Sequence, residues 1–160
     1  MPLIGDSIPG WPTGLTLTTL ASLLPTVPLP FADRQDFEDA ERGFLGALEP
    51  CVIRAEDGRV VWDNDSYAFL EGEAPETVNP SLWRQGQLNA IAGIFEVTPG
   101  IYQARGFDLS VATFLRTDNG WVIVDPLLVV ETMRAAFDLV RMHVADLPVV
   151  AVIHTHSHVD

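Results

Sequence analysis

The sequence contains no lysine and a single cysteine, and none of its apolar runs reaches the roughly 20 residues that a membrane-spanning helix needs. All nine basic residues are arginines, and 22 acidic residues bring the net charge to −13. Because such a charge repels nucleic acid and anionic lipid, we expect neither as a partner. It also repels small anions, so any anion site in this chain must be made locally positive by a metal ion or a placed arginine.

The single Cys51 excludes an intramolecular disulfide and the cysteine-rich classes of zinc module. It lies in the apolar run Cys51-Val52-Ile53. We therefore expect a small buried core residue there rather than a nucleophile.

The first thirty residues hold half of the prolines and no basic residue. A secretory signal has a positively charged region before its apolar stretch, and this feature is missing. We expect residues 1–30 to form a Pro-rich N-terminal extension and residues 31–160 to form one domain. A secretory signal encoded upstream of a misplaced start codon would not be visible in this sequence. Both a cytoplasmic and an exported location therefore stay open.

Helical and hairpin signals fill the first half of that domain. Asp33 to Leu48 is predicted to be a helix, since its apolar residues share a face and its first turn is acidic. The apolar runs on either side of Asp57-Gly58 predict a β-hairpin. Ser81 to Ala92 is predicted to be a helix with Ser81 as its N-cap.

From Ile94 onward, short β-rich runs are separated by turn residues. The predicted strands are Ile94–Val97, Ile101–Ala104, Val111–Arg116, Trp121–Asp125 and Val149–Ile153, and apolar residues at helical spacing predict a helix from Val130 to Val144.

The order strand, helix, strand over residues 121–153 predicts a parallel crossover, with Val149–Ile153 buried inside a sheet. Ligands of such sheets bind just beyond the carboxyl ends of the strands. Asp125 and the final hexapeptide, Thr155 to Asp160, both follow strand ends. We therefore expect the chemistry of the chain at this edge.

Three of the four histidines stand within the last seven residues. His156, His158 and Asp160 alternate along an extended segment, so their side chains fall on one side, with neighbouring Cα atoms about 6.6 Å apart. Two imidazoles in this arrangement can reach one zinc ion, and the carboxylate can reach a neighbouring ion. We predict His156, His158 and Asp160 as metal ligands.

Two other histidines compete for the same role. His154 and His156 have the same spacing, but only the later register supplies a carboxylate two residues after the second histidine. We expect His154 to lie in the strand. His143 is expected at a helix C-terminus, where its charge would be favourable.

The run Thr155–Asp160 resembles the start of the T-H-x-H-x-D-H motif of the metallo-β-lactamase superfamily. Asp125 matches the superfamily's first motif, an aspartate that supports the metal-binding loop without touching the metal. A helix-capping role before Pro126 is its other interpretation, and the two roles are compatible. Three further stretches, 31–44, 77–85 and 100–110, resemble alkyl sulfatases of the type that degrades sodium dodecyl sulfate. Val111 and His154 depart from that family's usual asparagine and aromatic residue.

The resemblance implies an α+β fold, the N-terminal part of an αββα sandwich, incomplete in these 160 residues. It implies two zinc ions, a small alkyl sulfate substrate and a homodimer in the full-length protein. The expected activity is hydrolysis of alkyl sulfates to alcohol and sulfate, with His expected directly after Asp160. Because further ligands and the later domains would follow this stretch, we expect the 160 residues alone to be inactive.

Two alternatives remain at this stage. A lactonase or thioesterase of the same superfamily would use the same metals on a neutral ester, and a non-catalytic fragment would pack against a partner. Arg105 is a candidate anion contact, although a solvated loop arginine is the preferred interpretation. No residue is identified as the general acid.

Overall fold

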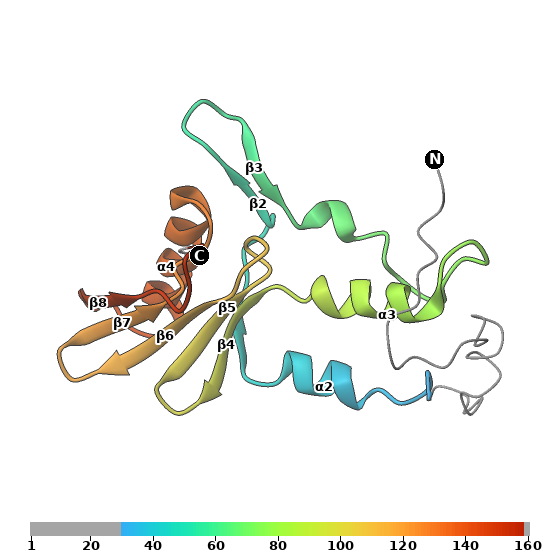
Figure 1. Cartoon of the computed structure of the whole chain (residues 1–160), viewed down its shortest axis with the longest axis horizontal. Coiled ribbons are helices and arrows are strands. Elements are labelled where there is room, and N and C mark those ends of the chain that lie inside the picture. Colours follow the sequence, from blue (N-terminus) through green and yellow to red (C-terminus); the bar gives the residue numbers. More distant parts are fainter. Residues whose placement is uncertain (1–29, 159–160) are drawn as a thin grey trace, which may run out of the picture. The chain divides into compact units, whose positions relative to one another are not determined.

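A computed structural model of the protein describes residues 30–158 (Figure 1). By internal contacts the chain divides into residues 1–33 and 34–160, and every helix and strand of the described part belongs to the second unit. The Pro-rich extension predicted for residues 1–30 falls almost entirely outside the described residues. Asp160 also lies outside them.

Residues 34–158 form a mixed six-stranded sheet, an antiparallel two-stranded sheet and three α-helices. The larger sheet has the strand order β1-β4-β5-β6-β7-β8 and the smaller one pairs β2 with β3. The strands are β1 Phe44–Gly46, β2 Val52–Arg54, β3 Val60–Asp63, β4 Gly93–Thr98, β5 Ile101–Arg105, β6 Ala112–Thr117, β7 Gly120–Val124 and β8 Val149–Ile153. The helices are α2 Gln35–Glu41, α3 Pro80–Asn89 and α4 Val130–His143, with a short 3-10 helix at Asp65–Tyr67. The α+β fold class is therefore confirmed.

The hairpin predicted around Asp57-Gly58 and the predicted strand-helix-strand unit are both present. Every neighbouring pair in the larger sheet is antiparallel except β7 and β8, which run parallel on either side of α4 in the sequence. Because β5, β7 and β8 point the same way, their carboxyl ends meet at one edge of the sheet. None of the helices in residues 30–158 is long and apolar enough to cross a lipid bilayer.

The core forms where α4 packs on the sheet. Trp121 is fully buried, and its ring contacts those of Tyr102 and Phe114 edge to face, which are favourable arrangements of aromatic rings. The Trp121 indole N–H donates to the carbonyl of Ala145 beyond α4. Cys51 is buried as predicted; burial raises the pKa of its thiol, and Asp65 and Asp63 raise it further.

The helix expected over Asp33–Leu48 is wrong in its second half. The helix ends at Glu41, and Phe44–Gly46 pairs instead with β4. Gly43 makes the change of direction, with a left-handed φ of 74° and its carbonyl accepting a hydrogen bond from the Glu96 amide. The apolar residues have helical spacing, but Phe44–Gly46 forms a strand because it pairs with β4, a segment far away in the sequence.

The N-cap of α3 lies two residues before the predicted one. Asn79, not Ser81, caps this helix, and the Asn79 side chain accepts a hydrogen bond from the Ser81 amide. Pro80 occupies the first helical position, where its missing N–H costs nothing.

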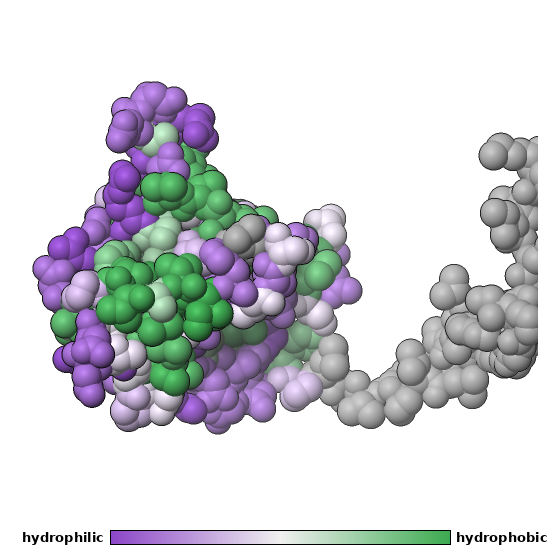
Figure 2. All heavy atoms as spheres, turned by 60° about the vertical axis from the view of Figure 1, so that its left-hand side comes forward, coloured by the Kyte–Doolittle hydropathy of each residue, from purple (hydrophilic) through white to green (hydrophobic). Residues whose placement is uncertain are grey.

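Strand β8 is exposed, although we expected it to be buried inside a sheet. Val149, Val150, Val152 and Ile153 are each between 42% and 49% exposed, because β8 is the edge strand of the sheet that the described residues build. β8 lies at the left of Figure 1, and Figure 2, which turns that side forward, shows a broad hydrophobic area on this face. An uncovered apolar edge strand of this kind is able to pair with another strand.

Candidate metal centre

The loop that follows β8 is held by one carboxylate at the end of β7. Asp125 accepts two hydrogen bonds from Thr155, one from its amide at 2.8 Å and one from its hydroxyl at 2.7 Å. The Asp125 amide in turn donates to the carbonyl of Ile153, the last residue of β8. Asp125 has a left-handed φ of 52°, a conformation that aspartate adopts more readily than most residues. The start of the histidine loop is therefore fixed to the neighbouring strand.

His156 and His158 lie side by side in this loop. Their ring centroids are 4.9 Å apart, and both residues are exposed. The Thr155 hydroxyl has one proton, and the short bond to Asp125 uses it, so the contact at 3.1 Å with His156 Nδ1 is a hydrogen bond in the tautomer that carries its proton on Nδ1. That tautomer places the proton on Nδ1 and leaves Nε2 as the ring atom able to ligate a metal.

The donors in this loop suit zinc but do not complete a site. Imidazole nitrogen is a common zinc ligand, and a zinc ion takes four ligands. Within residues 30–158 no three His, Cys, Asp or Glu side chains come close enough together to hold an ion. Asp160, the third predicted ligand, is not among those residues.

The competing histidines lie elsewhere. His154 is exposed and comes directly after β8, so the expectation that it lies within the strand is wrong by one residue. His143 is the last residue of α4, as predicted, and its ring packs so closely on Gly46 that a Cβ there would lie 2.5 Å away. The capping alternative for Asp125 is also wrong, because α4 begins after Val129 without any side-chain cap.

A buried carboxylate that the sequence reasoning missed organises the neighbouring loop. Asp108 is 9% exposed and accepts hydrogen bonds from the Ser110 amide, the Leu128 amide and the Thr132 hydroxyl. It joins the loop between β5 and β6 to the start of α4. The Asp-x-Ser spacing was a visible turn signal, but the partners in α4 are 20 and 24 residues away.

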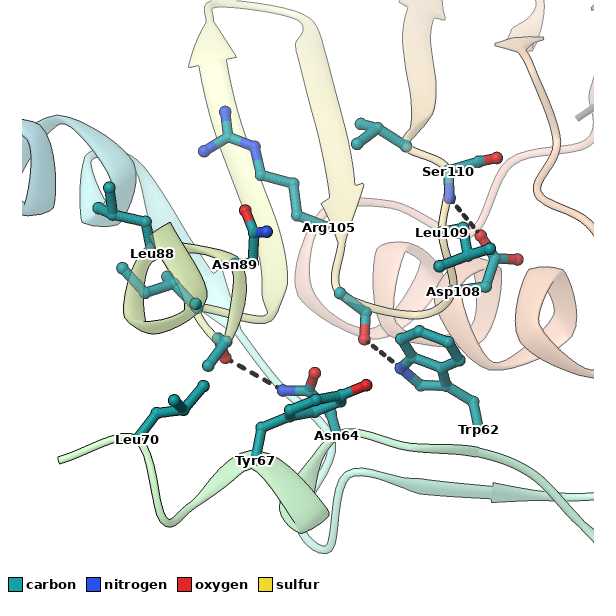
Figure 3. Close-up of a pocket in the computed structure, with 15 residues that line it drawn as sticks. Trp62, Asn64, Tyr67, Leu70, Leu88, Asn89, Arg105, Asp108, Leu109 and Ser110 are labelled. Atoms are coloured by element: carbon teal, nitrogen blue, oxygen red, sulfur yellow. Dashed lines mark hydrogen bonds between the residues drawn. The ribbon is translucent and has the colours of Figure 1, made fainter. Parts of the chain in front are cut away.

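A cavity of about 450 Å³ opens beside this loop (Figure 3). Its wall combines the end of α3, the segment after β3 and the loop 106–111. Arg105 also lines the cavity, but it is a half-buried strand residue stacked over Phe95 and not the solvated loop arginine we expected. Its guanidinium donates to Gln103 and to the Ala40 carbonyl, and burial lowers the pKa of Arg105.

The sequence of this chain is similar to those of known proteins. Residues 105–160 match the metallo-beta-lactamase superfamily. The chain is 52% identical over 134 residues to a linear primary-alkylsulfatase and 50% identical over 133 residues to an (R)-specific secondary-alkylsulfatase, both from Pseudomonas sp. It is 48% identical over 144 residues to an alkyl/aryl-sulfatase of Saccharomyces cerevisiae.

The chain is similar in sequence to these alkylsulfatases. The fold agrees: the structure of the stereoselective inverting sec-alkylsulfatase Pisa1 from Pseudomonas sp. superposes with a TM-score of 0.78 at 50% identity. That match covers 83% of this chain and 21% of the solved one. The chain thus spans about a fifth of the length of these relatives. The resemblance to alkyl sulfatases that we drew from the sequence motifs is confirmed.

Proposed function

We propose that this chain belongs to a metal-dependent alkyl sulfatase, which hydrolyses alkyl sulfate esters to an alcohol and sulfate. The observation that carries the proposal is the identity of about 50% to three sulfatases over more than 80% of the chain. Within it, residues 31–160 are assigned to a metallo-β-lactamase-like catalytic domain and residues 1–30 to an extension. A homodimer of the complete protein is part of the proposal, carried over from the resemblance.

The proposed metal site uses His156 and His158 for one zinc ion and Asp160 for a second. The paired rings in the loop and the exposed position of both imidazoles support the assignment. When bound, two zinc ions supply hydroxide near neutral pH and offset the charge of a sulfate ester. Such a positive centre also answers the repulsion that a net charge of −13 exerts on an anionic substrate.

The residues of this chain prepare that site. Asp125 orients the loop through both hydrogen bonds to Thr155, and we assign it a supporting role without contact to the metal. Thr155 then passes the orientation on by accepting the Nδ1–H of His156, which directs Nε2 as the ligand atom.

The experiment uses the complete product of the gene that encodes this chain, loaded with zinc. Sulfate release from dodecyl sulfate and zinc content are measured for the unchanged protein and for His156→Ala and His158→Ala. We expect both variants to lose turnover and bound zinc, because each removes one imidazole ligand.

His154→Ala is the matched control, since it removes an exposed imidazole from the same loop. It should keep zinc content near that of the unchanged protein. Loss of zinc on changing His154 while His158→Ala retains it would move the metal register by two residues. Absence of sulfate release from the unchanged protein would reject the function.

A further inference from the structure

The turn between β7 and α4 contains two residues in an unfavourable backbone conformation. Asp125 and Leu127 have left-handed φ angles of 52° and 67°, and Pro126 lies between them. Aspartate enters this region more readily than most residues, but a bulky leucine there is strained. Backbone strain of this kind persists only where the surrounding structure holds the chain in place. The turn 125–128 therefore depends on the contacts that fix it.

The structure shows such contacts at both ends of the turn and in its middle. At the start, the Asp125 amide donates to the Ile153 carbonyl at 2.9 Å. In the middle, the Leu127 side chain is 4% exposed and belongs to the hydrophobic core. At the end, the Leu128 amide donates to the Asp108 carboxylate at 2.9 Å. A side chain from the loop between β5 and β6 thus fixes the end of the turn.

Asp108 is itself firmly attached. Its carboxylate is mostly buried, and its two oxygens accept from the Ser110 amide at 2.7 Å (Figure 3), the Leu128 amide and the Thr132 hydroxyl at 2.8 Å. Thr132 is fully buried in the first turn of α4. Breaking any of these bonds would leave a polar atom without its partner in a mostly buried place, which is unfavourable. Asp108 therefore ties the turn both to its own loop and to α4.

The other end of the turn carries the histidine loop. Asp125 accepts two hydrogen bonds from Thr155, and the Thr155 hydroxyl lies 3.1 Å from His156 Nδ1. Between Asp125 and Leu128 the chain has little freedom, because the ring of Pro126 fixes its φ and the next side chain is buried. A displacement at Leu128 is therefore passed on to Asp125.

We propose that Asp108 is a positioning residue of the metal site, which acts on the histidine loop through the turn 125–128 and Asp125. The inference rests on the proposed function, because it assigns Asp108 a role toward the proposed zinc ligands. Asp108 acts without contact to the metal. Its effect on zinc binding is smaller than that of Asp125, since it lies one step further from the ligands.

The test measures the zinc affinity of the complete gene product by competition with a chelator, for the unchanged protein and for Asp108→Asn. Asparagine has nearly the shape of aspartate, but its amide nitrogen is a donor and meets one of the three donors that the carboxylate accepts. We expect zinc affinity to fall about 3- to 10-fold, less than the loss of about 10–100-fold typical of groups that bond directly to a ligand. Hydrogen exchange at the Thr155 amide of the metal-free protein should accelerate at least about threefold.

The double variant Asp108→Asn/Asp125→Asn tests whether the effect runs through the turn. If Asp108 acts through Asp125, adding Asp108→Asn to Asp125→Asn should change zinc affinity by less than about twofold, because coupled residues are not additive. A further loss as large as that of Asp108→Asn alone would overturn the inference, since Asp108 would then act independently of Asp125.

Asp65→Asn is the matched control. Asp65 also accepts from a distant backbone amide, that of Cys51 at 3.2 Å, but this bond joins the segment after β3 to the start of β2. We expect it to keep zinc affinity within about twofold. Thr132→Val, nearly identical in shape, removes one donor to Asp108 and serves where Asp108→Asn folds poorly. It should lower zinc affinity in the same direction.

Unchanged zinc affinity and unchanged exchange at Thr155 in a folded Asp108→Asn or Thr132→Val protein would overturn the inference and leave the proposed function standing. An equal loss of zinc affinity in Asp65→Asn would also overturn it, because the effect would then follow general stability. A complete gene product that binds no zinc at the histidine loop would reject the proposed metal site. Faster exchange at Thr155 in Asp108→Asn would in that case still support the link from Asp108 to the loop.

Discussion

Asp125 shows how much of the proposed site depends on a single residue. Its carboxylate holds Thr155 by two hydrogen bonds, and the Thr155 hydroxyl in turn lies 3.1 Å from His156 Nδ1. The left-handed backbone at Asp125 restricts its replacements, because most residues other than asparagine and glycine are strained there.

Asp125→Asn tests this role without disturbing the backbone. The amide can accept one of the two hydrogen bonds but presents a donor to the second, so we expect zinc affinity to fall about 10–100-fold. Zinc titration of the complete gene product checks this, with hydrogen exchange at the Thr155 amide as a structural readout. Asp118→Asn, in the turn between β6 and β7, is the control. Unchanged affinity and unchanged exchange at Thr155 would contradict the role.

The candidate residues differ in how far the sequence could reveal them. His156 and His158 were recognisable because two histidines at alternate positions after an apolar strand form a local pattern, and the structure brings their rings together. Asp108 was not recognised, because its partners Leu128 and Thr132 approach it only after α4 packs on the sheet. Whether His156, His158 and Asp160 bind metal remains a prediction.

Among the elements, those with a local signal were the predictable ones. The hairpins with turns at Asp57-Gly58 and Asp118-Asn119-Gly120 are present, as are α4 and the parallel strand after it. β1 was not predictable, since a three-residue strand has no periodicity of its own and depends on pairing with β4.

Gly43→Ala tests the account of how the helix gives way to β1. A Cβ at Gly43 would lie 2.1 Å from the Glu96 carbonyl oxygen, a backbone atom that cannot move aside while β4 stays paired. We expect the free energy of unfolding to fall by at least about 3 kcal/mol, the upper range for single substitutions. Urea unfolding followed by circular dichroism measures it.

Gly58→Ala separates the clash from the backbone strain. Gly58 also has a left-handed φ, of 85°, but a Cβ there would meet nothing within 4 Å. This variant should cost only on the order of 1 kcal/mol. Equal losses in the two variants would show that backbone strain alone matters and that the contact with β4 is unimportant.

At the scale of the whole molecule, the negative net charge opposes the binding of the anionic substrate that we propose. A chain of net charge −13 repels an anionic ester unless cations gather at the reacting centre. A lactone or thioester is neutral and poses no such problem. This chain spans about a fifth of its relatives' length. The preference between charged and neutral esters is therefore tested on the complete gene product.

The most direct measurement compares ester classes in the complete gene product loaded with zinc. Initial rates are recorded for dodecyl sulfate, a lactone and a thioester of similar chain length, with sulfate quantified as product. We predict that kcat/KM for the alkyl sulfate exceeds the other two by at least about 100-fold, because a site built for a charged group strongly rejects analogues that lack it. A higher kcat/KM for the lactone or the thioester would contradict the assignment and place the protein with another type of hydrolase.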